Sequence, residues 1–318
     1  MSGTKLTVML LGGARRVSLA ELIKESGRKT GHHVEIVSYD LTREVPISLV
    51  GKVIKGLRWD DPGVIDDIER VVKENRVDIM LPIVNGAVEI ASKCKIRMPD
   101  VFIPVSDAEI TTRLFDKAEA AKIFKDAGFS IPRTYSVLSA QLPAIAKPRK
   151  GGASRGIEVF YDMDALMHLP DLKNFFLQEY IENGREYTVD AYIDSKGRTL
   201  VKVPRERIEV MGGESTRTMT CRNEILEQMT DEIIAKLGLR GPINMQFIYD
   251  PAEDRYLLIE VNPRIAGAVI CSILAGAPIT DYILLEALGK PMNVCYDWRP
   301  DTLLARYLKD AVFDMGKR

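Results

Sequence analysis

The chain has 318 residues, of which 46% are hydrophobic and 28% are charged, so it is long enough for two or three compact units with buried cores. The formal net charge of −1 gives no argument for binding nucleic acid or an anionic membrane, and no apolar stretch has transmembrane length. The 4 cysteines are scattered without metal-ligand spacing, and residues 1–5 lack the pattern of a signal peptide. We therefore expect a cytoplasmic protein with reduced thiols.

The first 110 residues predict a small, doubly wound parallel α/β domain. A continuous apolar run from Leu6 to Leu11 meets Gly12-Gly13, and a helical pattern follows over residues 14–25. This order of strand, tight turn and helix is typical of the opening of a parallel α/β sheet. Further predicted elements are strands at 34–38 and 77–84 and a helix at 62–74.

Two arginines stand in the first of these turns. Arg15 and Arg16 lie between a strand and the N-terminus of a helix, where an anionic substrate group could bind. The turn is not G-x-G-x-x-G, so a dinucleotide-binding oxidoreductase is poorly supported.

Residues 111–160 contain a predicted helix and a glycine-rich loop. The helix runs from Asp116-Lys117 to a glycine C-cap at Gly128. A strand at 144–147 ends in Lys147, and the loop 149–156 follows before a strand at 157–160. Glycines allow successive backbone N–H groups to point at phosphates, but the loop is not a P-loop. A basic hairpin turn is the alternative.

Residues 175–217 predict strands followed by a long polar loop. Strands are expected at 175–182, 188–192 and 199–203. The segment 204–217 is rich in charge and glycine, which favours an irregular loop over the substrate. Arg205 and Arg207 in this segment are candidate contacts for a substrate carboxylate. A helix at 223–237 follows.

Two β-rich runs, 243–250 and 256–264, flank a turn and predict a hairpin. Gln246 lies on the first strand, and Glu260 and Asn262 lie two residues apart on the second, so the latter two face the same side. One carboxylate and two amide oxygens suit Mg²⁺, which fills its other positions with water and phosphates. Arg264 could meet a phosphate oxygen. The alternative is the solvated face of an edge strand.

The order of these residues resembles a known family. Glutamine, glutamate fourteen residues on, asparagine two further and then Pro-Arg resembles the metal-binding end of the ATP-grasp ligases, above all the large-subunit modules of carbamoyl phosphate synthetase. The resemblance extends over residues 113–264 by motif and more loosely over the whole chain. It implies an α/β plus α+β protein: an N-terminal α/β domain (1–110) and a two-lobed ATP-grasp domain, with a phosphate lid in the N-lobe (111–185) and the metal site in the C-lobe (186–318).

The resemblance also implies roles for individual residues. Lys147 would touch the α- and β-phosphates, the backbone of 179–181 would meet adenine, and Glu186 would accept from the ribose. Lys147 and Arg264 would be catalytic, with Arg264 stabilising the transferring phosphoryl group. Gln246, Glu260 and Asn262 would hold one or two Mg²⁺ ions, with Mn²⁺ as an alternative. The implied ATP-binding residues are Lys117, Lys147, Gly151, Gly152, Ser154, Arg155, Gly156, Gln178, Glu179, Tyr180, Ile181 and Glu186.

The implied function is an ATP- and Mg²⁺-dependent carboxylate–amine, or carboxylate–thiol, ligase that acts through an acylphosphate. Its partners would be a small carboxylate and an amine, and a homodimer is common in the resembling enzymes. Two alternatives stay open: a bicarbonate-activating enzyme of the carboxylase or carbamoyl phosphate type, and a non-catalytic, ATP-binding regulatory protein.

Overall fold

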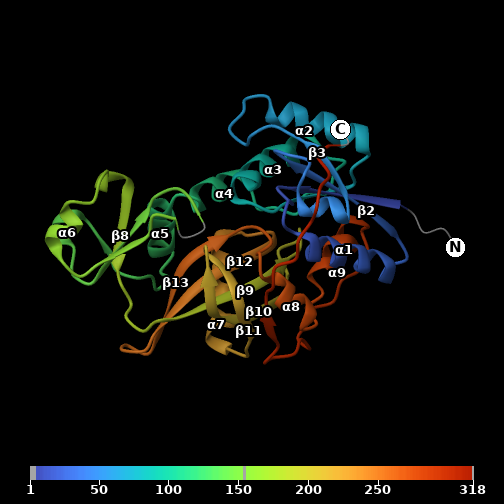
Figure 1. Ribbon diagram of the computed structural model, residues 1–318. Coiled ribbons are helices and arrows are strands. Elements are labelled where there is room, and N and C mark those ends of the chain that lie inside the picture. The colour runs from blue at the N-terminus through green and yellow to red at the C-terminus, as the bar shows by residue number, and fades with distance from the viewer. Residues whose placement is uncertain (1–4, 153–154, 317–318) are drawn as a thin grey trace.

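The computed structural model describes residues 5–152 and 155–316, which form a mixed α/β protein (Figure 1). The strands are β1 (Lys5–Leu11), β2 (His33–Asp40), β3 (Lys52–Lys55), β4 (Ile79–Pro82), β5 (Thr134–Tyr135), β6 (Ala144–Pro148), β7 (Glu158–Phe160), β8 (Phe175–Glu179), β9 (Arg185–Ile193), β10 (Thr199–Met211), β11 (Glu214–Thr220), β12 (Gly241–Asp250), β13 (Arg255–Asn262) and β14 (Leu303–Ala305). The α-helices are α1 (Val17–Lys29), α2 (Val64–Asn75), α3 (Asn85–Arg97), α4 (Ala108–Leu114), α5 (Lys117–Asp126), α6 (Met163–Met167), α7 (Glu224–Leu237), α8 (Val269–Leu274) and α9 (Ile279–Ala287). No helix in these described ranges is long and apolar enough to cross a membrane.

The N-terminal part is built on a parallel sheet with strand order β3-β2-β1-β4. Alternate residues of β1 face opposite sides, so Val8 packs in the core that contains α1 while Met9 packs in the core that contains α2 and α3. Gly13 has a packing reason, because a Cβ there would lie 2.5 Å from the hydroxyl of Ser38. Helix α3 is not predicted from the sequence, since Asn85-Gly86 at its start is typical of a turn.

The central sheet has strand order β13-β12-β9-β10-β11-β14, and its neighbouring strands are antiparallel. One face is apolar and packs against α4, α5 and α7. The prediction of an irregular loop at 204–217 is wrong: β10 continues to Met211, and β11 begins at Glu214 after a turn at Gly212-Gly213. The last strand, β14, is short and ends at Ala305.

A smaller antiparallel sheet, of order β5-β8-β6-β7, forms a lobe that lies apart from the rest in Figure 1. Its buried core is small and includes Ala146, Phe160, Leu166 and Leu177. The lobe contacts the central sheet at the end of β8, where Glu179 pairs with Arg255 of β13. Its strands therefore bring the lysine at the end of β6 toward the polar face of the central sheet.

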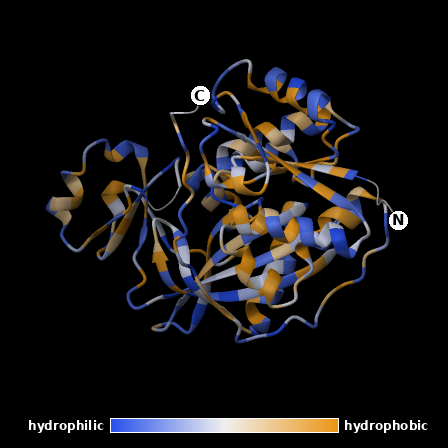
Figure 2. Cartoon of the chain, turned by 45° about the vertical axis from the view of Figure 1, so that its right-hand side comes forward, coloured by the Kyte–Doolittle hydropathy of each residue, from blue (hydrophilic) through white to orange (hydrophobic). Residues whose placement is uncertain are grey.

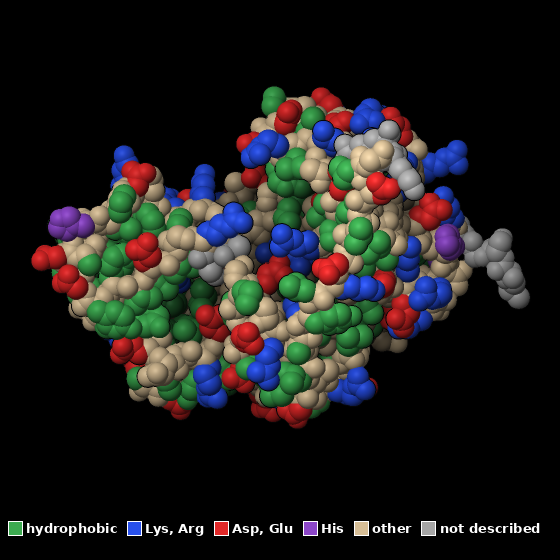
Figure 3. Space-filling model, in the orientation of Figure 1, with side chains coloured by type: hydrophobic (Ala, Val, Ile, Leu, Met, Phe, Trp, Pro, Cys, Tyr) green, Lys and Arg blue, Asp and Glu red, His purple; other side chains and the backbone are tan. Residues whose placement is uncertain are grey.

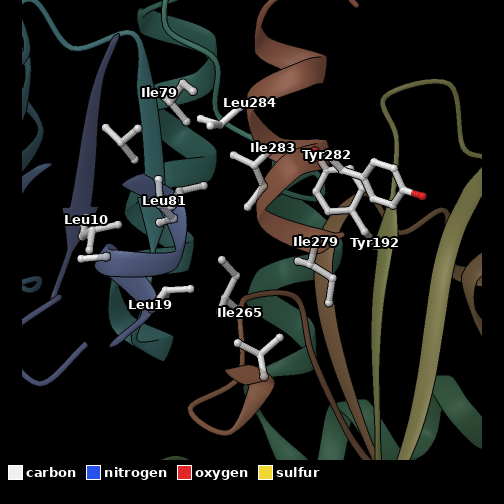
Figure 4. Close-up of a cluster of buried hydrophobic side chains, with 14 of the residues drawn as sticks. Leu10, Leu19, Ile79, Leu81, Tyr192, Ile265, Ile279, Tyr282, Ile283 and Leu284 are labelled. Carbon is white, nitrogen blue, oxygen red and sulfur yellow. The ribbon is translucent and has the colours of Figure 1, made fainter. Parts of the chain in front are cut away.

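The N-terminal sheet and the central sheet share one hydrophobic core. Figure 4 shows Leu10, Leu19 and Leu81 of the N-terminal part beside Ile265, Ile279, Ile283 and Leu284 from the end of the chain. Helix α1 packs against α9, and Ser26 donates a buried hydrogen bond of 2.9 Å to Thr280. Figure 2 shows that hydrophobic and hydrophilic residues alternate along the strands and around the helices.

Candidate functional site

A cavity of about 310 Å³ opens where the small lobe meets the central sheet and the N-terminal part. Figure 3 shows this face hollowed, with Lys, Arg, Asp and Glu side chains gathered around the hollow. Most of the residues predicted from the sequence line it. They are Lys117, Lys147, Gly151, Gly152, Arg155, Gln178, Glu179, Tyr180, Ile181, Glu186, Arg207, Gln246, Glu260, Asn262 and Arg264. Gly156 is not among the lining residues, and Ser154 lies outside the described part of the chain.

The register of β12 and β13 puts the predicted metal ligands together. Gln246 lies opposite Glu260, and Asn244 lies opposite Asn262. Directly opposed residues of an antiparallel pair face the same side, so all of these side chains share one face of the sheet. An irregularity between Gln246 and Phe247 shifts the later pairing by one residue, because Gln246 pairs with Glu260 but Phe247 pairs with Leu258.

The side-chain oxygen of Asn262 is buried and has no hydrogen-bond partner among the described residues. A buried acceptor without a partner is costly, and a bound cation would satisfy it. The described residues hold no cluster of three or more His, Cys, Asp and Glu that could bind a metal without such amide oxygens. A cation here would therefore depend on Glu260, on the amides of Gln246 and Asn262, and on oxygens of a ligand.

Lys147 is buried at the end of β6, and its Nζ donates a 3.0 Å hydrogen bond to the side-chain oxygen of Gln178. The Gln178 amide in turn donates to the carbonyl of Pro132 at 3.3 Å, which fixes its orientation. Burial lowers the pKa of Lys147 to about 8, while the nearby charges of Glu260 and Glu186 favour its protonated form. Gln178 is thus placed to hold Lys147.

The pKa of Lys147 predicts how nucleotide affinity depends on pH. A protonated lysine attracts phosphates, so affinity for MgADP should be flat below about pH 8 and should fall by up to about tenfold per pH unit above it. Affinity falls as the pH rises because the free protein loses the Lys147 proton once the pH passes the lowered pKa of this side chain. Calorimetric titration between about pH 7 and pH 9.5 would test this. A flat profile in the wild type, or the same break in Lys147→Met, would contradict the prediction.

Gln178 should act through Lys147. Gln178→Leu removes the acceptor and should weaken ATP binding by about 2- to 10-fold, the size of one net hydrogen bond. Gln178→Glu should instead move the affinity break to higher pH, because a carboxylate favours the charged lysine. MgADP titrations of both variants over pH would measure this. Wild-type affinity in Gln178→Leu together with an unmoved break in Gln178→Glu would show that Lys147 does not depend on Gln178.

The N-terminus of α5 contacts the end of β6. Asp116 caps the helix through the N–H groups of Ala118 and Glu119, and it pairs with Arg149 at 2.9 Å. The Nζ of Lys117 donates to the carbonyls of Pro148 and Gly151, at 3.1 and 3.3 Å. Lys117 therefore lies at the base of the glycine-rich loop and faces the cavity.

One part of the cavity is an apolar slot. Its lining includes Phe124, Ile131, Ile145, Ile181, Ile248 and Leu258. The backbone N–H groups of Glu179 and Tyr180 donate to the carbonyls of Arg133 and Pro143. The N–H of Ile181 has no acceptor among the described residues. The slot thus offers apolar walls with one free backbone donor at its edge.

Two arginines of the cavity wall are held by other side chains. Arg207 pairs with Glu186 at 2.8 Å and donates to the carbonyl of Gly213. Arg264 donates to the side-chain oxygen of Asn85 at 2.6 Å, and burial lowers its pKa. Asn85 begins α3 and also lines the cavity, so the N-terminal part contributes directly to this site.

Arg205 does not face the cavity, which corrects its predicted role as a substrate contact. It and Asp190 are each only 1% exposed, and they pair at 2.7 Å. Arg205 also donates to Thr218, while Asp190 accepts from Asn244 and Ser272. This buried network holds neighbouring strands and α8 together on the same face of the sheet as the candidate metal residues, because Asp190 lies opposite Asn244.

The remaining predicted substrate residues lie in the β1–α1 turn. Arg15 is exposed and does not line the cavity. Arg16 does not line it either, and pairs with Glu214, the first residue of β11, at 2.6 Å. The partner of Arg16 is about two hundred residues away in sequence, so no local pattern could have indicated it.

Residues 171–308 match a family described as "ATP-grasp in the biosynthetic pathway with Ter operon". Among curated proteins, the chain is similar to the C-terminal section of the carbamoyl phosphate synthase large chain of Methanopyrus kandleri, with 23% identity over 264 residues. That alignment covers 74% of this chain and 49% of the relative, so the chain spans about half of the relative's length.

Solved structures resemble the chain over most of its length. The biotin carboxylase domain of Hydrogenobacter thermophilus 2-oxoglutarate carboxylase, in complex with MgADP, ADP and bicarbonate, matches with a TM-score of 0.74 and 17% identity, covering 93% of this chain and 73% of that one. The N5-carboxyaminoimidazole synthetase of Staphylococcus aureus, complexed with ADP, matches with a TM-score of 0.72 and 18% identity, covering 96% and 82%. At these identities the structural matches show a shared fold.

Proposed function

Because the chain has the ATP-grasp fold and its residues 171–308 match an ATP-grasp family, we propose that it is an ATP- and Mg²⁺-dependent carboxylate–amine ligase. The reaction would pass through an acylphosphate. Small molecules would be the substrates, and a homodimer and a cytoplasmic location remain predictions from the sequence.

The observation that carries this proposal is the arrangement of one cavity. The cavity is lined by apolar side chains beside the backbone of Ile181, by the oxygens of Gln246, Glu260 and Asn262, and by the buried Lys147. A purine needs the first, a divalent cation the second, and a phosphate chain the third. A nucleoside triphosphate with its cation requires all of them together.

The nucleotide would be held by residues from both lobes. The Ile181 N–H would donate to the adenine edge, and Glu186 would accept from the ribose hydroxyls after giving up part of its contact with Arg207. Lys147 and Lys117 would offset phosphate charge. The glycine-rich loop, including Gly151 and Gly152, would cover the phosphates with its backbone.

The residues present fit a bound Mg²⁺. Asn262 supplies an unpartnered buried oxygen, and Glu260 and Gln246 supply a carboxylate and an amide on the same face. When bound, Mg²⁺ would neutralise charge on the phosphate oxygens and orient them. The single carboxylate in this set predicts that the ion binds mainly together with the nucleotide.

The chemistry would need positioning and charge stabilisation from the protein. An oxygen of the substrate carboxylate would bond to the γ-phosphorus, and the bond to the bridging oxygen would break to release ADP. Arg264, held by Asn85, would stabilise the transferring phosphoryl group, aided by Lys147. The amine nitrogen would then bond to the acyl carbon, phosphate would leave, and the amine would lose a proton.

A bicarbonate-activating reaction is the second candidate, and two of the comparisons support it. The sequence relatives are carbamoyl phosphate synthase sections, and one structural match contains bicarbonate with MgADP. Bicarbonate would attack the γ-phosphate in the same manner as a carboxylate. The two candidates differ in the acceptor, so the same assay separates them.

The test is phosphate release that depends on both Mg²⁺ and ATP. Pools of amino acids, small carboxylates and bicarbonate would be screened in the presence of amines. We expect stimulation by one carboxylate pool, and stimulation by bicarbonate alone would favour the second candidate. Absence of MgATP binding by calorimetry would overturn both proposals.

A further inference from the structure

Parts of the chain that are distant in sequence converge on the carboxylate of Glu214, at the start of β11. Arg16, which follows β1, donates hydrogen bonds to it from two guanidinium nitrogens, at 2.6 and 3.2 Å. Arg306, after β14, donates to the same carboxylate at 2.5 Å. A guanidinium fork that meets a carboxylate in this manner has the geometry used for recognising carboxylate and phosphate groups.

The convergence depends on a glycine. A Cβ on Gly267 would lie 2.9 Å from the Glu214 carboxylate and 3.0 Å from the guanidinium of Arg16. Arg306 also donates to the carbonyl of Gly267. Gly267 lies three residues after Arg264, on the segment that leaves the candidate metal strand. Arg16 and Arg306, called the arginine cluster below, therefore pack against the segment that also carries Arg264.

The cluster lies next to the cavity. Gly213, the neighbour of Glu214 in the turn, lines the cavity, and so does Arg264. Gly267, which would touch both Arg16 and Glu214 if it carried a Cβ, lies three residues after Arg264, so the cluster lies close to that residue. An acceptor with its reacting carboxylate at Arg264 would extend a second group toward Arg16 and Arg306.

We propose that Arg16 and Arg306 form a subsite for an anionic group of the acceptor, and that Glu214 occupies this subsite until the substrate displaces it. The group would be a carboxylate or phosphate other than the carboxylate that is phosphorylated. This inference rests on the proposed function. It narrows the substrate class to acceptors with at least two anionic groups.

Charge and exposure support displacement. The two guanidiniums face one carboxylate, which leaves an excess of one positive charge. The side chain of Glu214 is 43% exposed and follows a glycine turn, so it can leave without unfolding a strand. The hydrogen bond from Arg16 lowers the pKa of Glu214 to about 2, so the carboxylate stays ionised at neutral pH and only a competing anion would replace it.

The test is anion binding by Glu214→Gln in the absence of nucleotide. Sulfate and succinate would be titrated at constant ionic strength, and the binding of each anion would be measured as the rise in the protein's melting temperature. If Glu214 occupies the arginines about nine-tenths of the time, its removal should tighten binding of one of these anions about tenfold. The double variant Arg16→Gln/Glu214→Gln should lose this gain. A preference for succinate would indicate a carboxylate group, and a preference for sulfate a phosphate.

Glu253→Gln is the matched control. Glu253 is also held by two arginines, Arg133 and Arg255, and its side chain is 47% exposed, but it lies on the β12–β13 turn and does not line the cavity. This variant should bind both anions as the wild type does. Equal tightening in the control would show a general effect of freed arginines and would overturn the subsite.

Two further results would overturn the inference: unchanged anion affinity in Glu214→Gln, or tightening that persists in the double variant. MgADP affinity reports whether the variants are folded and tests the nucleotide site separately, so failure of the subsite is distinguishable from failure of the proposed function. If Glu214→Gln loses MgADP binding, the anion titration is repeated on Glu214→Asp, and its result decides whether the subsite exists. The shorter aspartate side chain weakens the contacts with the arginines and should also tighten anion binding.

Discussion

Replacing Glu260 with glutamine should lower Mg²⁺-dependent ATP turnover on the order of 10²- to 10³-fold. A bound metal supplies several kcal/mol of charge stabilisation in such a reaction, and Glu260 is the one carboxylate in the proposed ligand set. The side chain keeps its shape, so the β12–β13 pairing should persist. Steady-state phosphate release would measure the effect, with circular dichroism to confirm the fold.

Glu253→Gln on the same hairpin controls for general loss of charge, because Glu253 pairs with Arg133 and Arg255 and does not line the cavity. A second readout is the dependence of ADP affinity on Mg²⁺, which should be strong in the wild type and weak in Glu260→Gln. Turnover equal to that of the wild type would refute the metal assignment.

Replacing Lys147 with methionine should weaken ATP binding by about 10- to 100-fold. A hydrogen bond to a charged group contributes about 1.5–3 kcal/mol, and Lys147 is a buried cation in the cavity wall. Methionine retains most of the side-chain volume at this buried site. Calorimetric titration with MgADP and with a non-hydrolysable ATP analogue would measure the loss.

Lys122→Met is the control for Lys147, since Lys122 lies on the exposed face of α5 and pairs with Asp126. It should bind nucleotide like the wild type. The phosphate role of Lys147 would be wrong if Lys147→Met bound nucleotide with unchanged affinity.

Local patterns were sufficient for much of the fold. The alternation of strands and helices gave the parallel sheet, and the two-residue spacing of Glu260 and Asn262 gave their common face. The hairpin turn after Asp250 would by itself place Gln246 opposite Ile259, and the irregularity after Gln246 places it opposite Glu260 instead, so sequence spacing alone does not put Gln246 in the candidate metal set. Where local patterns were sufficient, the partners are close along the chain.

Non-local pairing explains what could not be predicted. Residues 204–211 are strand because they continue the pairing of β10 with β9 and β11, although their charges and glycines favour a loop. Arg205 can be buried because Asp190 and Thr218 accept hydrogen bonds from its guanidinium group. Only the folded sheet brings these three residues together. Arg16, Glu214 and Arg306 lie far apart along the chain, so their contact leaves no local signature in the sequence.

The core shared by the N-terminal and central sheets has a consequence for how the protein unfolds. Because Leu10 and Leu19 pack in the same cluster as Ile279 and Ile283, neither sheet can lose its structure without exposing the apolar face of the other. Amide hydrogen exchange should therefore show these two sheets protected to a similar extent, as one cooperative unit. The small lobe around Ala146 and Leu177 has its own core and should exchange faster. A fragment that begins at residue 111 would expose the partner face of α9 and should aggregate.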